Sequence, residues 1–275
     1  MPEPGLELVG DEELTELTDV IRSSRPSGCG PDDDTFPAKV RTFEEEVAAR
    51  AGTAHALAVN AGTSALYLAL TGVGVGPGDE VIVPGFTFVA TISAVVYARA
   101  LPVLAEVDAT FNLDPADVEA RITPRTKAIV AVHMLGAAAR MEELRAMARR
   151  HDLALIEDAA QAFGGTYQGR WLGSFGDIGA YSFNEYKTIT CGDGGMVVTD
   201  DEQLYRRCFA MHDQGHSPDR KGVEVGARPM LGLNFRMTEV QGAVLLAQLR
   251  KLDRIRSHLR DNRDVVWRLL EGLPG

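Results

Sequence analysis

Residues 153–165 of this 275-residue chain read L-A-L-I-E-D-A-A-Q-A-F-G-G, an apolar run that ends in Asp158. Residues 176–200 read G-D-I-G-A-Y-S-F-N-E-Y-K-T-I-T-C-G-D-G-G-M-V-V-T-D, a second apolar run that leads to Lys187 and a glycine-rich turn. Short apolar runs bounded by glycine and polar residues predict buried strands. Each of these two strands is followed by a residue capable of chemistry.

Lys187 and Asp158 form a pair with a specific chemical use. A lysine that bonds covalently to an aldehyde must lose its proton, so its site has to lower its pKa. A buried carboxylate beside a pyridine nitrogen keeps that ring cationic. Pyridoxal phosphate requires both groups, so the sequence predicts a cofactor site with Lys187 and Asp158 as its catalytic residues. The alternatives are a surface lysine on a turn and a carboxylate that caps a helix. Glu157 alternates to the opposite face of the strand and is predicted to be structural.

Outside this stretch, apolar runs alternate with amphipathic segments. Strands are predicted at 55–59, 80–83, 101–107, 127–132 and 153–157, with helices between them at 63–71, 88–99, 115–121 and 141–150. Strands separated by helices indicate βαβ units, so we expect an α/β fold with a mostly parallel sheet. Further helices are predicted over Asp11–Arg22, 38–51 and 236–270, and a loop over 25–35.

A second motif, A-V-N-A-G-T-S-A-L at 58–66, is suited to binding a phosphate. A strand is followed by a helix that begins near Thr63, and the N–H groups and dipole of a helix N-terminus attract anions. Gly62 permits a close approach of the backbone, while Thr63 and Ser64 add hydroxyl groups. Ser182 would add another from a neighbouring strand. An ordinary Ser/Thr helix cap would explain the same residues.

Two other patterns do not predict sites. G-V-G-V-G-P-G at 72–78 follows a helix rather than a strand, which argues against a dinucleotide-binding loop. His212 and His216 flank Asp213, but no further ligand completes a coordination shell, so no metal site is predicted. His133 ends the strand 127–132 and is expected at the mouth of the sheet, where it can touch a substrate.

Composition limits the partners and the location. A formal net charge of -11 argues against a surface for nucleic acid. Three cysteines, an odd and sparse set, suit a reducing compartment better than a disulfide framework. The sequence shows neither a secretory signal pattern nor an apolar run of membrane-spanning length. We therefore expect a cytoplasmic protein that binds neither nucleic acid nor membranes.

The motifs E-D-A-A-Q-A-F-G, S-F-N-E-Y-K and G-D-G-G-M-V-V-T resemble the central motifs of the DegT/StrS-type family of pyridoxal-phosphate sugar aminotransferases. V-P-G-F-T-F-V-A-T and L-G-L-N-F-R-M-T-E-V-Q-G-A-V extend the resemblance from about Phe43 to Leu252. It implies a three-layer α/β/α fold of the pyridoxal-phosphate transferase fold type I. It also implies a homodimer with shared active sites and a small C-terminal domain that is missing from this chain.

The resemblance further assigns roles to residues. Lys187 would bind the aldehyde and move a proton, Phe88 would stack on the pyridine ring, and Gln161 would hydrogen-bond the phenolic oxygen. Asn234 would reach the phosphate held by the neighbouring subunit. From sequence alone, Phe88 could equally be a core residue and Gln161 an ordinary exposed glutamine.

Three domain segments are predicted. Residues 1–37 form an N-terminal arm of helix and loop, residues 38–245 a large domain that binds pyridoxal phosphate, and residues 246–275 a helix that leads into a truncated small domain. The long helix carries an apolar stripe that is expected to need a partner surface from that small domain, namely Leu245, Leu246, Leu249, Leu252 and Ile255.

The expected function is transfer of an amino group from glutamate or glutamine to a keto- or aldehydo-sugar. The acceptor would be a nucleotide sugar, an octulosonate-type sugar or an aminocyclitol precursor. Sugar dehydratases in the family carry a histidine at the lysine position, so Lys187 argues against that activity. The alternative is a truncated, non-catalytic or regulatory relative that still binds pyridoxal phosphate.

Overall fold

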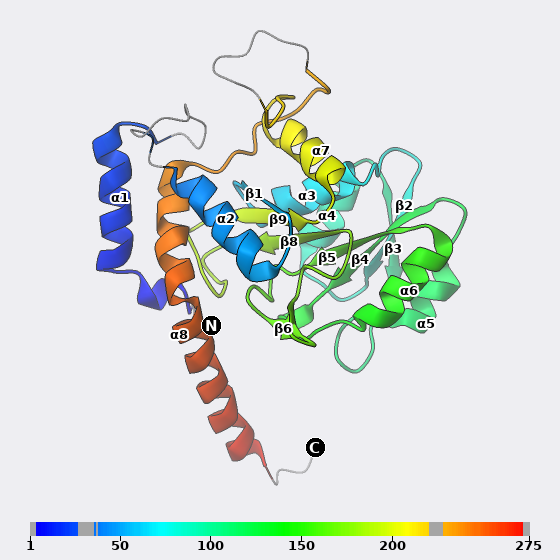
Figure 1. Cartoon of the computed structure of the whole chain (residues 1–275). Helices are drawn as coiled ribbons and strands as arrows, with labels where there is room; N and C mark the ends of the chain where they lie inside the picture. Colours follow the sequence, from blue (N-terminus) through cyan, green and yellow to red (C-terminus); the bar gives the residue numbers. More distant parts are fainter. Residues whose placement is uncertain (1–3, 27–35, 37, 220–227, 272–275) are drawn as a thin grey trace.

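The computed structural model of the chain describes residues 4–26, 36, 38–219 and 228–271, and its centre is a seven-stranded sheet (Figure 1). The strand order is β1-β9-β8-β5-β4-β2-β3. The strands are β1 (His55–Val59), β2 (Glu80–Pro84), β3 (Leu101–Ala105), β4 (Thr126–Val132), β5 (Ala154–Asp158), β8 (Ile178–Ser182) and β9 (Gly195–Thr199). Within this sheet β9 alone runs opposite to the other strands, so the predicted mostly parallel sheet is confirmed. A small separate hairpin joins β6 (Thr166–Tyr167) to β7 (Arg170–Trp171).

Helices cover both faces of the sheet and give the three predicted layers (Figure 1). One face packs against α3 (Gly62–Gly72), α4 (Val89–Tyr97) and α7 (Glu202–His212). The other packs against α2 (Lys39–Ala51), α5 (Pro115–Arg121), α6 (Met141–His151) and the first half of α8 (Glu239–Leu270). Successive side chains of a strand point to opposite faces of the sheet and so contribute to both cores. In β1, Ala56 and Ala58 face one layer while Leu57 and Val59 face the other.

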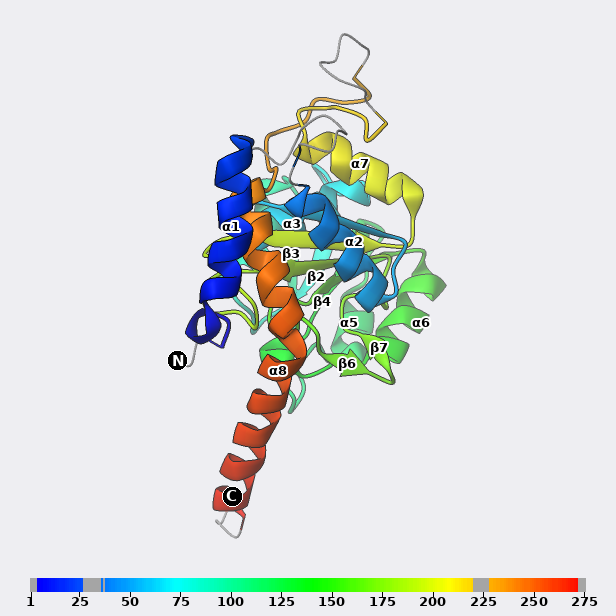
Figure 2. The same ribbon diagram turned by 60° about the vertical axis from the view of Figure 1, so that its left-hand side comes forward.

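The N-terminal arm lies along α8 (Figure 2). It consists of a short 3-10 turn, η1 (Leu6–Leu8), and α1 (Asp11–Ser23). Glu13 is buried and accepts hydrogen bonds from Lys251 Nζ at 2.7 and 2.8 Å and from Gln248 Nε2 at 2.9 Å. Because a buried charge is tolerated only when it is paired, this cluster fixes how α1 lies on α8.

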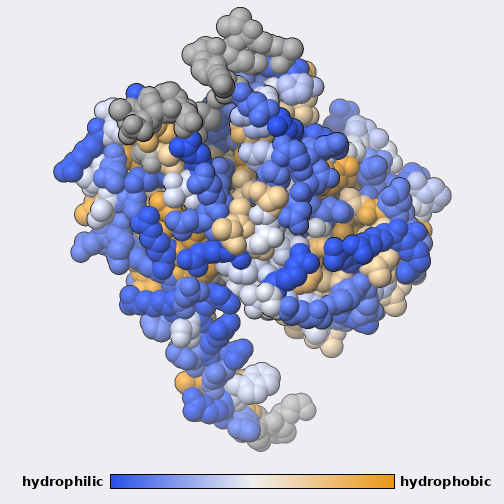
Figure 3. Space-filling view, viewed as in Figure 1, coloured by the Kyte–Doolittle hydropathy of each residue, from blue (hydrophilic) through white to orange (hydrophobic). Residues whose placement is uncertain are grey.

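The apolar stripe of α8 behaves differently from the prediction. Leu245, Leu246, Leu249, Leu252 and Ile255 are all buried within this chain, so they need no further domain to cover them. The second half of the helix projects away from the body (Figures 1 and 2) and exposes Val265, Val266, Trp267, Leu269 and Leu270. Its surface is mostly hydrophilic with small hydrophobic patches (Figure 3).

Most predicted elements occur within two residues of their expected bounds. The long helix begins at Glu239, three residues after the predicted start, because Thr238 and Gln241 form a capping box there. The predicted boundary between residues 245 and 246 falls inside α8. The predicted loop at 25–35 lies mostly outside the described residues, as do residues 272–275. None of the helices in the described part of the chain is long and apolar enough to cross a membrane.

Candidate cofactor site

The predicted site residues gather at one edge of the sheet. The parallel strands β1, β2, β4, β5 and β8 end along this edge, and the segments that carry Gly62, Phe88, Asp158 and Lys187 follow directly. Ligands of open α/β folds bind beyond the carboxyl ends of parallel strands. The topology therefore brings together segments that lie more than a hundred residues apart in sequence.

Asp158 is the last residue of the central strand β5 and is 5% exposed. Its Oδ2 accepts a hydrogen bond from Thr91 Oγ1 at 2.8 Å, and its Oδ1 accepts one from Ala160 N at 3.2 Å. Burial raises the pKa of Asp158, although these hydrogen bonds and the nearby charge of Lys187 oppose the shift. No helix follows β5 to be capped, since the chain enters a turn, so the helix-cap alternative is wrong.

Lys187 lies in the loop between β8 and β9, and its amide donates a hydrogen bond to Asn184 O at 3.0 Å. Its side chain is partly buried. Burial lowers the pKa of Lys187, and the carboxylate of Asp158 opposes the shift. The two residues therefore lie within electrostatic reach of one another, and burial shifts the pKa of Lys187 in the direction that favours a nucleophilic amine.

The predicted phosphate corner is formed where the start of α3 meets the end of β8. A Cβ placed on Gly62 would lie 2.5 Å from Ser182 Cβ and 2.8 Å from Ser182 Oγ, so only glycine permits this contact. No described side chain caps α3, and Ser64 Oγ instead donates to Asn60 Oδ1 at 2.7 Å. Thr63 and Ser64 are thus not ordinary helix caps. The N–H groups of the first turn remain available to an anion.

Phe88 precedes α4 and is 64% exposed, which rules out the alternative of a core phenylalanine. Thr91, which bonds Asp158, lies three residues later in the first turn of the same helix. Phe88 therefore lies about one helical turn from Thr91, the residue that bonds the buried carboxylate.

Gln161 and Asn234 are held at the same edge by other contacts. Gln161 Oε1 accepts a hydrogen bond from Leu135 N at 2.9 Å, in the short turn η2 (Met134–Gly136). Asn234 is exposed, and the chain beside it joins the end of β1 because Asn60 N donates to Phe235 O at 2.8 Å. The roles of both residues toward a cofactor stay predictions.

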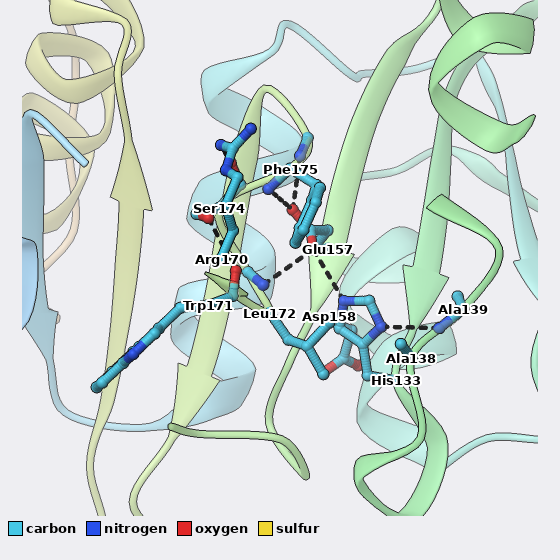
Figure 4. A network of polar contacts seen from close by, with 12 residues as sticks. His133, Ala138, Ala139, Glu157, Asp158, Arg170, Trp171, Leu172, Ser174 and Phe175 are labelled. Atoms are coloured by element: carbon cyan, nitrogen blue, oxygen red, sulfur yellow. Dashed lines mark hydrogen bonds and ion pairs between the residues drawn. The ribbon is translucent and has the colours of Figure 1, made fainter. Parts of the chain in front are cut away.

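His133 does not line the mouth of the site. Its ring is fully buried; Nε2 lies 2.8 Å from Glu157 Oε2, and Nδ1 accepts a hydrogen bond from Ala139 N at 3.2 Å (Figure 4). Because a backbone N–H can only donate, Nδ1 carries no proton and Nε2 donates to Glu157. The expectation that His133 touches a substrate is therefore wrong.

Glu157 completes this network on the face of β5 opposite to Asp158. Its carboxylate also accepts hydrogen bonds from the backbone N–H groups of Gly173, Phe175 and Gly176 at 2.5 to 2.9 Å (Figure 4). The predicted structural role of Glu157 is confirmed by these contacts. The turn that follows β7 is fixed by this buried carboxylate.

Sequence reasoning missed Thr91. Thr91 is buried, and Thr87 Oγ1 lies 2.9 Å from Thr91 Oγ1. Since the single hydroxyl proton of Thr91 is donated to Asp158, Thr87 must donate to Thr91. The available signal was the spacing of the two threonines in G-F-T-F-V-A-T, one helical turn apart.

The residues present fit pyridoxal phosphate. The site offers an amine with a lowered pKa, a buried carboxylate, an exposed aromatic ring and an uncapped helix N-terminus beside a serine hydroxyl. These groups match the aldehyde, the ring nitrogen, the ring face and the phosphate of that cofactor. In the described part of the chain, His, Cys, Asp and Glu side chains form no cluster that could hold a metal ion.

Curated relatives with similar sequences include proteins named as a sugar synthase and as a cyclitol aminotransferase, and one named as a pleiotropic regulatory protein. The chain is 47% identical to a GDP-perosamine synthase of Caulobacter vibrioides over 225 residues, which are 82% of this chain and 59% of the relative. It is 43% identical to the L-glutamine:2-deoxy-scyllo-inosose aminotransferase of Streptoalloteichus tenebrarius over 266 residues, 94% of this chain and 62% of the relative. The chain thus spans about three-fifths of the length of these curated relatives.

Solved structures show the same fold. 3-Amino-5-hydroxybenzoic acid synthase superposes with a TM-score of 0.88 at 39% identity, covering 97% of this chain and 68% of that one. A Bacillus subtilis protein, NtdA, solved with bound cofactor PMP, superposes with a TM-score of 0.77 at 30% identity, covering 92% of this chain and 56% of that one. Residues 9–275 match the family described as DegT/DnrJ/EryC1/StrS aminotransferases. The chain belongs to this family, whose cofactor is pyridoxal phosphate.

Proposed function

We propose that the protein is an aminotransferase that moves an amino group from glutamate or glutamine to a keto- or aldehydo-group on a sugar or cyclitol. The observation that carries the proposal is the pairing of Lys187 with the buried Asp158 at the carboxyl edge of the sheet. The proposal refers to the whole protein, because the chain covers 59% and 62% of the two relatives named above.

Lys187 and Asp158 have different proposed roles in the reaction. Bound pyridoxal phosphate supplies an aldehyde for a reversible covalent bond to an amine and a ring that withdraws electrons. Burial lowers the pKa of Lys187, which favours the amine over the ammonium form. Lys187 would bond to the aldehyde through Nζ with loss of water, and would carry a proton at the same atom once a substrate amine has replaced it. Asp158, held by the hydrogen bond from Thr91, would stabilise positive charge on the ring nitrogen.

The remaining residues hold the cofactor. The N–H groups that begin α3, the hydroxyl of Thr63 and Ser182 Oγ would bind the phosphate, and Ser64 Oγ would join them by exchanging Asn60 Oδ1 for a phosphate oxygen. The exposed ring of Phe88 would cover one face of the pyridine. Gln161 Nε2, which lies 3.6 Å from Met134 Sδ, would donate to the phenolic oxygen in place of that contact, while Oε1 keeps its hydrogen bond from Leu135 N.

A homodimer with shared active sites is part of the proposal. Asn234 is exposed and lies beside the end of β1; its Oδ1 accepts a hydrogen bond from Arg236 N at 3.3 Å, and its amide N–H groups would reach the phosphate of a second copy. Large apolar side chains are exposed on α4 and on the edge strand β3, namely Val89, Val96, Tyr97, Leu101 and Leu104. Exposed apolar surface of this kind supports a protein–protein contact.

The substrate class and the domain division are also proposals. Relatives are named for a GDP-sugar and for an inosose, and one is named for glutamine as donor, which supports nucleotide sugars and cyclitols as acceptors. Octulosonate-type sugars stay in the proposal as a third class of acceptor. We keep the predicted division as part of the proposal: an N-terminal arm (1–37), a cofactor domain (38–245) and a helix that leads into a small domain (246–275). A cytoplasmic location is proposed as well. Glutamate or glutamine consumption against a panel of keto-sugars and keto-inositols would identify the acceptor.

Covalent labelling tests the proposed function. Purified protein incubated with pyridoxal phosphate should gain a visible absorbance band, and borohydride should fix the cofactor to the peptide that contains Lys187. Addition of glutamate should bleach the band. Lys187→Ala should lose the band and the label. A band that persists in this variant, with label on another residue, would refute the assignment, and a band that ignores amines would indicate a non-catalytic binding relative.

A further inference from the structure

The loop that carries Lys187 is tied to the start of α8 by three polar residues that have no part in the chemistry proposed above. Asn184 and Asp193 lie at the two ends of this loop, and Gln241 lies in the first turn of α8. Asn184 Nδ2 donates to Asp193 Oδ1 at 3.1 Å, and Gln241 Nε2 donates to Asp193 O at 2.7 Å. Asp193 therefore joins the lysine loop to the helix.

Gln241 is the residue that makes this link possible. Its Oε1 accepts hydrogen bonds from Thr238 N and Thr238 Oγ1, both at 2.9 Å, and so completes the capping box of α8. Its Nε2 is left to donate to the lysine loop. A glutamate is equally common at this capping position but can only accept when ionised. An amide can both complete the capping box and donate to Asp193 O, whereas an ionised carboxylate could only complete the capping box.

Asn184 closes the turn that ends at Lys187. Its Oδ1 accepts a hydrogen bond from Tyr186 N at 3.3 Å, and its backbone O accepts one from Lys187 N at 3.0 Å. Its Nδ2 is the group that holds Asp193. A single side chain therefore fixes the turn locally and anchors it to the far end of the loop.

Packing reinforces the same junction. A Cβ placed on Gly194 would lie 2.8 Å from Cys191 Sγ and 3.2 Å from Met237 Cε, so the loop lies directly against the residue before Thr238. Phe183 N donates to Gly194 O at 2.8 Å and closes the base of the loop. The loop is therefore held at its base, at its turn and at its contact with α8.

We propose that Asn184, Asp193 and Gln241 form a clamp that positions Lys187 and couples its position to the start of α8. These are positioning residues, since they act on the lysine through the loop backbone. The inference rests on the proposed function in that Lys187 is taken to be the lysine that binds the cofactor. It predicts that a change at the start of α8 alters the behaviour of Lys187.

Hydrogen exchange of the cofactor-free chain tests the clamp. Gln241→Glu keeps the capping box and removes the donor to Asp193, while Asn184→Asp keeps the acceptor for Tyr186 and places two carboxylates together. Each variant should speed exchange at the amides of Lys187 and Cys191 about five- to tenfold, the effect of losing one hydrogen bond. Asp193→Ala should do the same, whereas Asp193→Asn, which still accepts from Asn184, should retain the protection of the wild type.

A second measurement separates positioning from mere structure. With pyridoxal phosphate bound, the pH midpoint of its visible absorbance should shift in Gln241→Glu, Asn184→Asp and Asp193→Ala, and should stay unchanged in Asp193→Asn. Unchanged exchange in the first three variants, or faster exchange without a shifted midpoint, would overturn the proposal. Failure of pyridoxal phosphate to label Lys187 in the wild type would refute the proposed function, and the exchange of the cofactor-free chain would still decide whether the clamp exists.

Discussion

At the scale of single residues, burial determines the chemistry of the Lys187–Asp158 pair. Desolvation disfavours both charges, so it raises the pKa of the acid and lowers the pKa of the base, while their mutual attraction works the other way. A cationic ring placed beside Asp158 would supply the missing counter-charge. A cationic ligand would therefore stabilise the ionised carboxylate of Asp158.

Replacing Asp158 by asparagine tests this role. Asparagine matches the shape of aspartate and can still accept from Thr91, but it carries no charge to stabilise a protonated ring. We expect Asp158→Asn to fold normally and to lose roughly 10²- to 10³-fold in turnover, as when an electrostatic partner of a reacting group is removed. Circular dichroism and steady-state kinetics measure the two effects. Near-normal turnover would show that Asp158 serves only the turn that follows β5.

Gly62→Ala tests the phosphate corner. Alanine is the better helix former, yet its Cβ would lie 2.5 Å from Ser182 Cβ and would force α3 away from β8. We expect a loss of about 1–3 kcal/mol in the free energy of unfolding and weaker binding of pyridoxal phosphate. Gly76→Ala is the control, because a Cβ there meets no atom within 4 Å. Equal stability and cofactor affinity in the two variants would contradict a tight corner.

At the scale of elements, the periodicity of the sequence predicted the strands and helices because it records which faces are buried. In β1 the alternating residues face the two cores on either side of the sheet, and in α6 the helically spaced apolar residues face one of them. Contacts between segments that are distant in the sequence produce no such pattern in the local sequence. The antiparallel direction of β9 and the bond between Thr91 and Asp158 depend on where the chain returns, and so they could not be predicted from local sequence.

Sequence reasoning could propose the site residues whose type the cofactor chemistry requires. It could not predict which way a side chain points. Lys187 and Asp158 follow from what the cofactor requires. The strand that ends at His133 was placed correctly, but its ring turns inward to Glu157, and only the three-dimensional structure reveals that partner. The same limit applies to Gln161, whose amide contacts Leu135.

The edge strand β1 is covered by a carboxylate from α2. Glu44 Oε1 accepts a hydrogen bond from Ala58 N at 2.7 Å, which satisfies an N–H group at the free edge of the sheet. Burial, together with the charges of Glu239 and Glu45, raises the pKa of Glu44 from its ordinary value of 4.5 to about 8. This carboxyl group is therefore a source of pH-dependent stability.

A folded-state pKa above the unfolded value means that the folded chain binds the proton more tightly. The stability that Glu44 contributes is then fully present below pH 4.5 and is lost as pH rises through about 8. Glu44→Gln keeps an acceptor for Ala58 N and removes the charge. Since one pKa unit corresponds to about 1.36 kcal/mol, we expect the variant to gain at least about 1 kcal/mol over the wild type at high pH relative to low pH.

Urea unfolding at pH 5.5 and pH 8.5 measures this difference. Glu45→Gln is the control, because Glu45 is exposed on the same helix and should give the same difference from wild type at both values. A stability difference between wild type and Glu44→Gln that does not change with pH would contradict the raised pKa.

At the scale of the whole molecule, α8 connects two different environments. Its first half is covered by α1 and α2, with Glu239 accepting hydrogen bonds from Lys39 N at 2.5 Å and Val40 N at 3.3 Å at the start of α2. Its second half extends beyond the sheet and its layers without cover (Figures 1 and 2). The start of the helix contacts the lysine loop, so the same element joins the site to the projecting end.

This arrangement predicts that added chain length improves the site. We expect a version extended to the length of the relatives to bind pyridoxal phosphate more tightly than this chain. Its kcat/KM should be higher by on the order of 10–100-fold, the effect of better substrate positioning. The exposed side chains of the projecting half, such as Trp267 and Leu270, should become buried in the extended form. Cofactor titration, steady-state turnover and the fluorescence of Trp267 measure these changes.

Two controls make this comparison decisive. Size-exclusion chromatography of both forms shows whether a dimer is present, which separates an effect on the site from an effect on assembly. Trp267→Gln in the short chain should leave cofactor affinity unchanged, because residue 267 is exposed there and lies far along α8 from Gln241. In the extended form the same change should destabilise the fold through a lost apolar contact. Equal turnover of the two forms, with Trp267 equally exposed in both, would show that the projecting half of α8 has no role in completing the site.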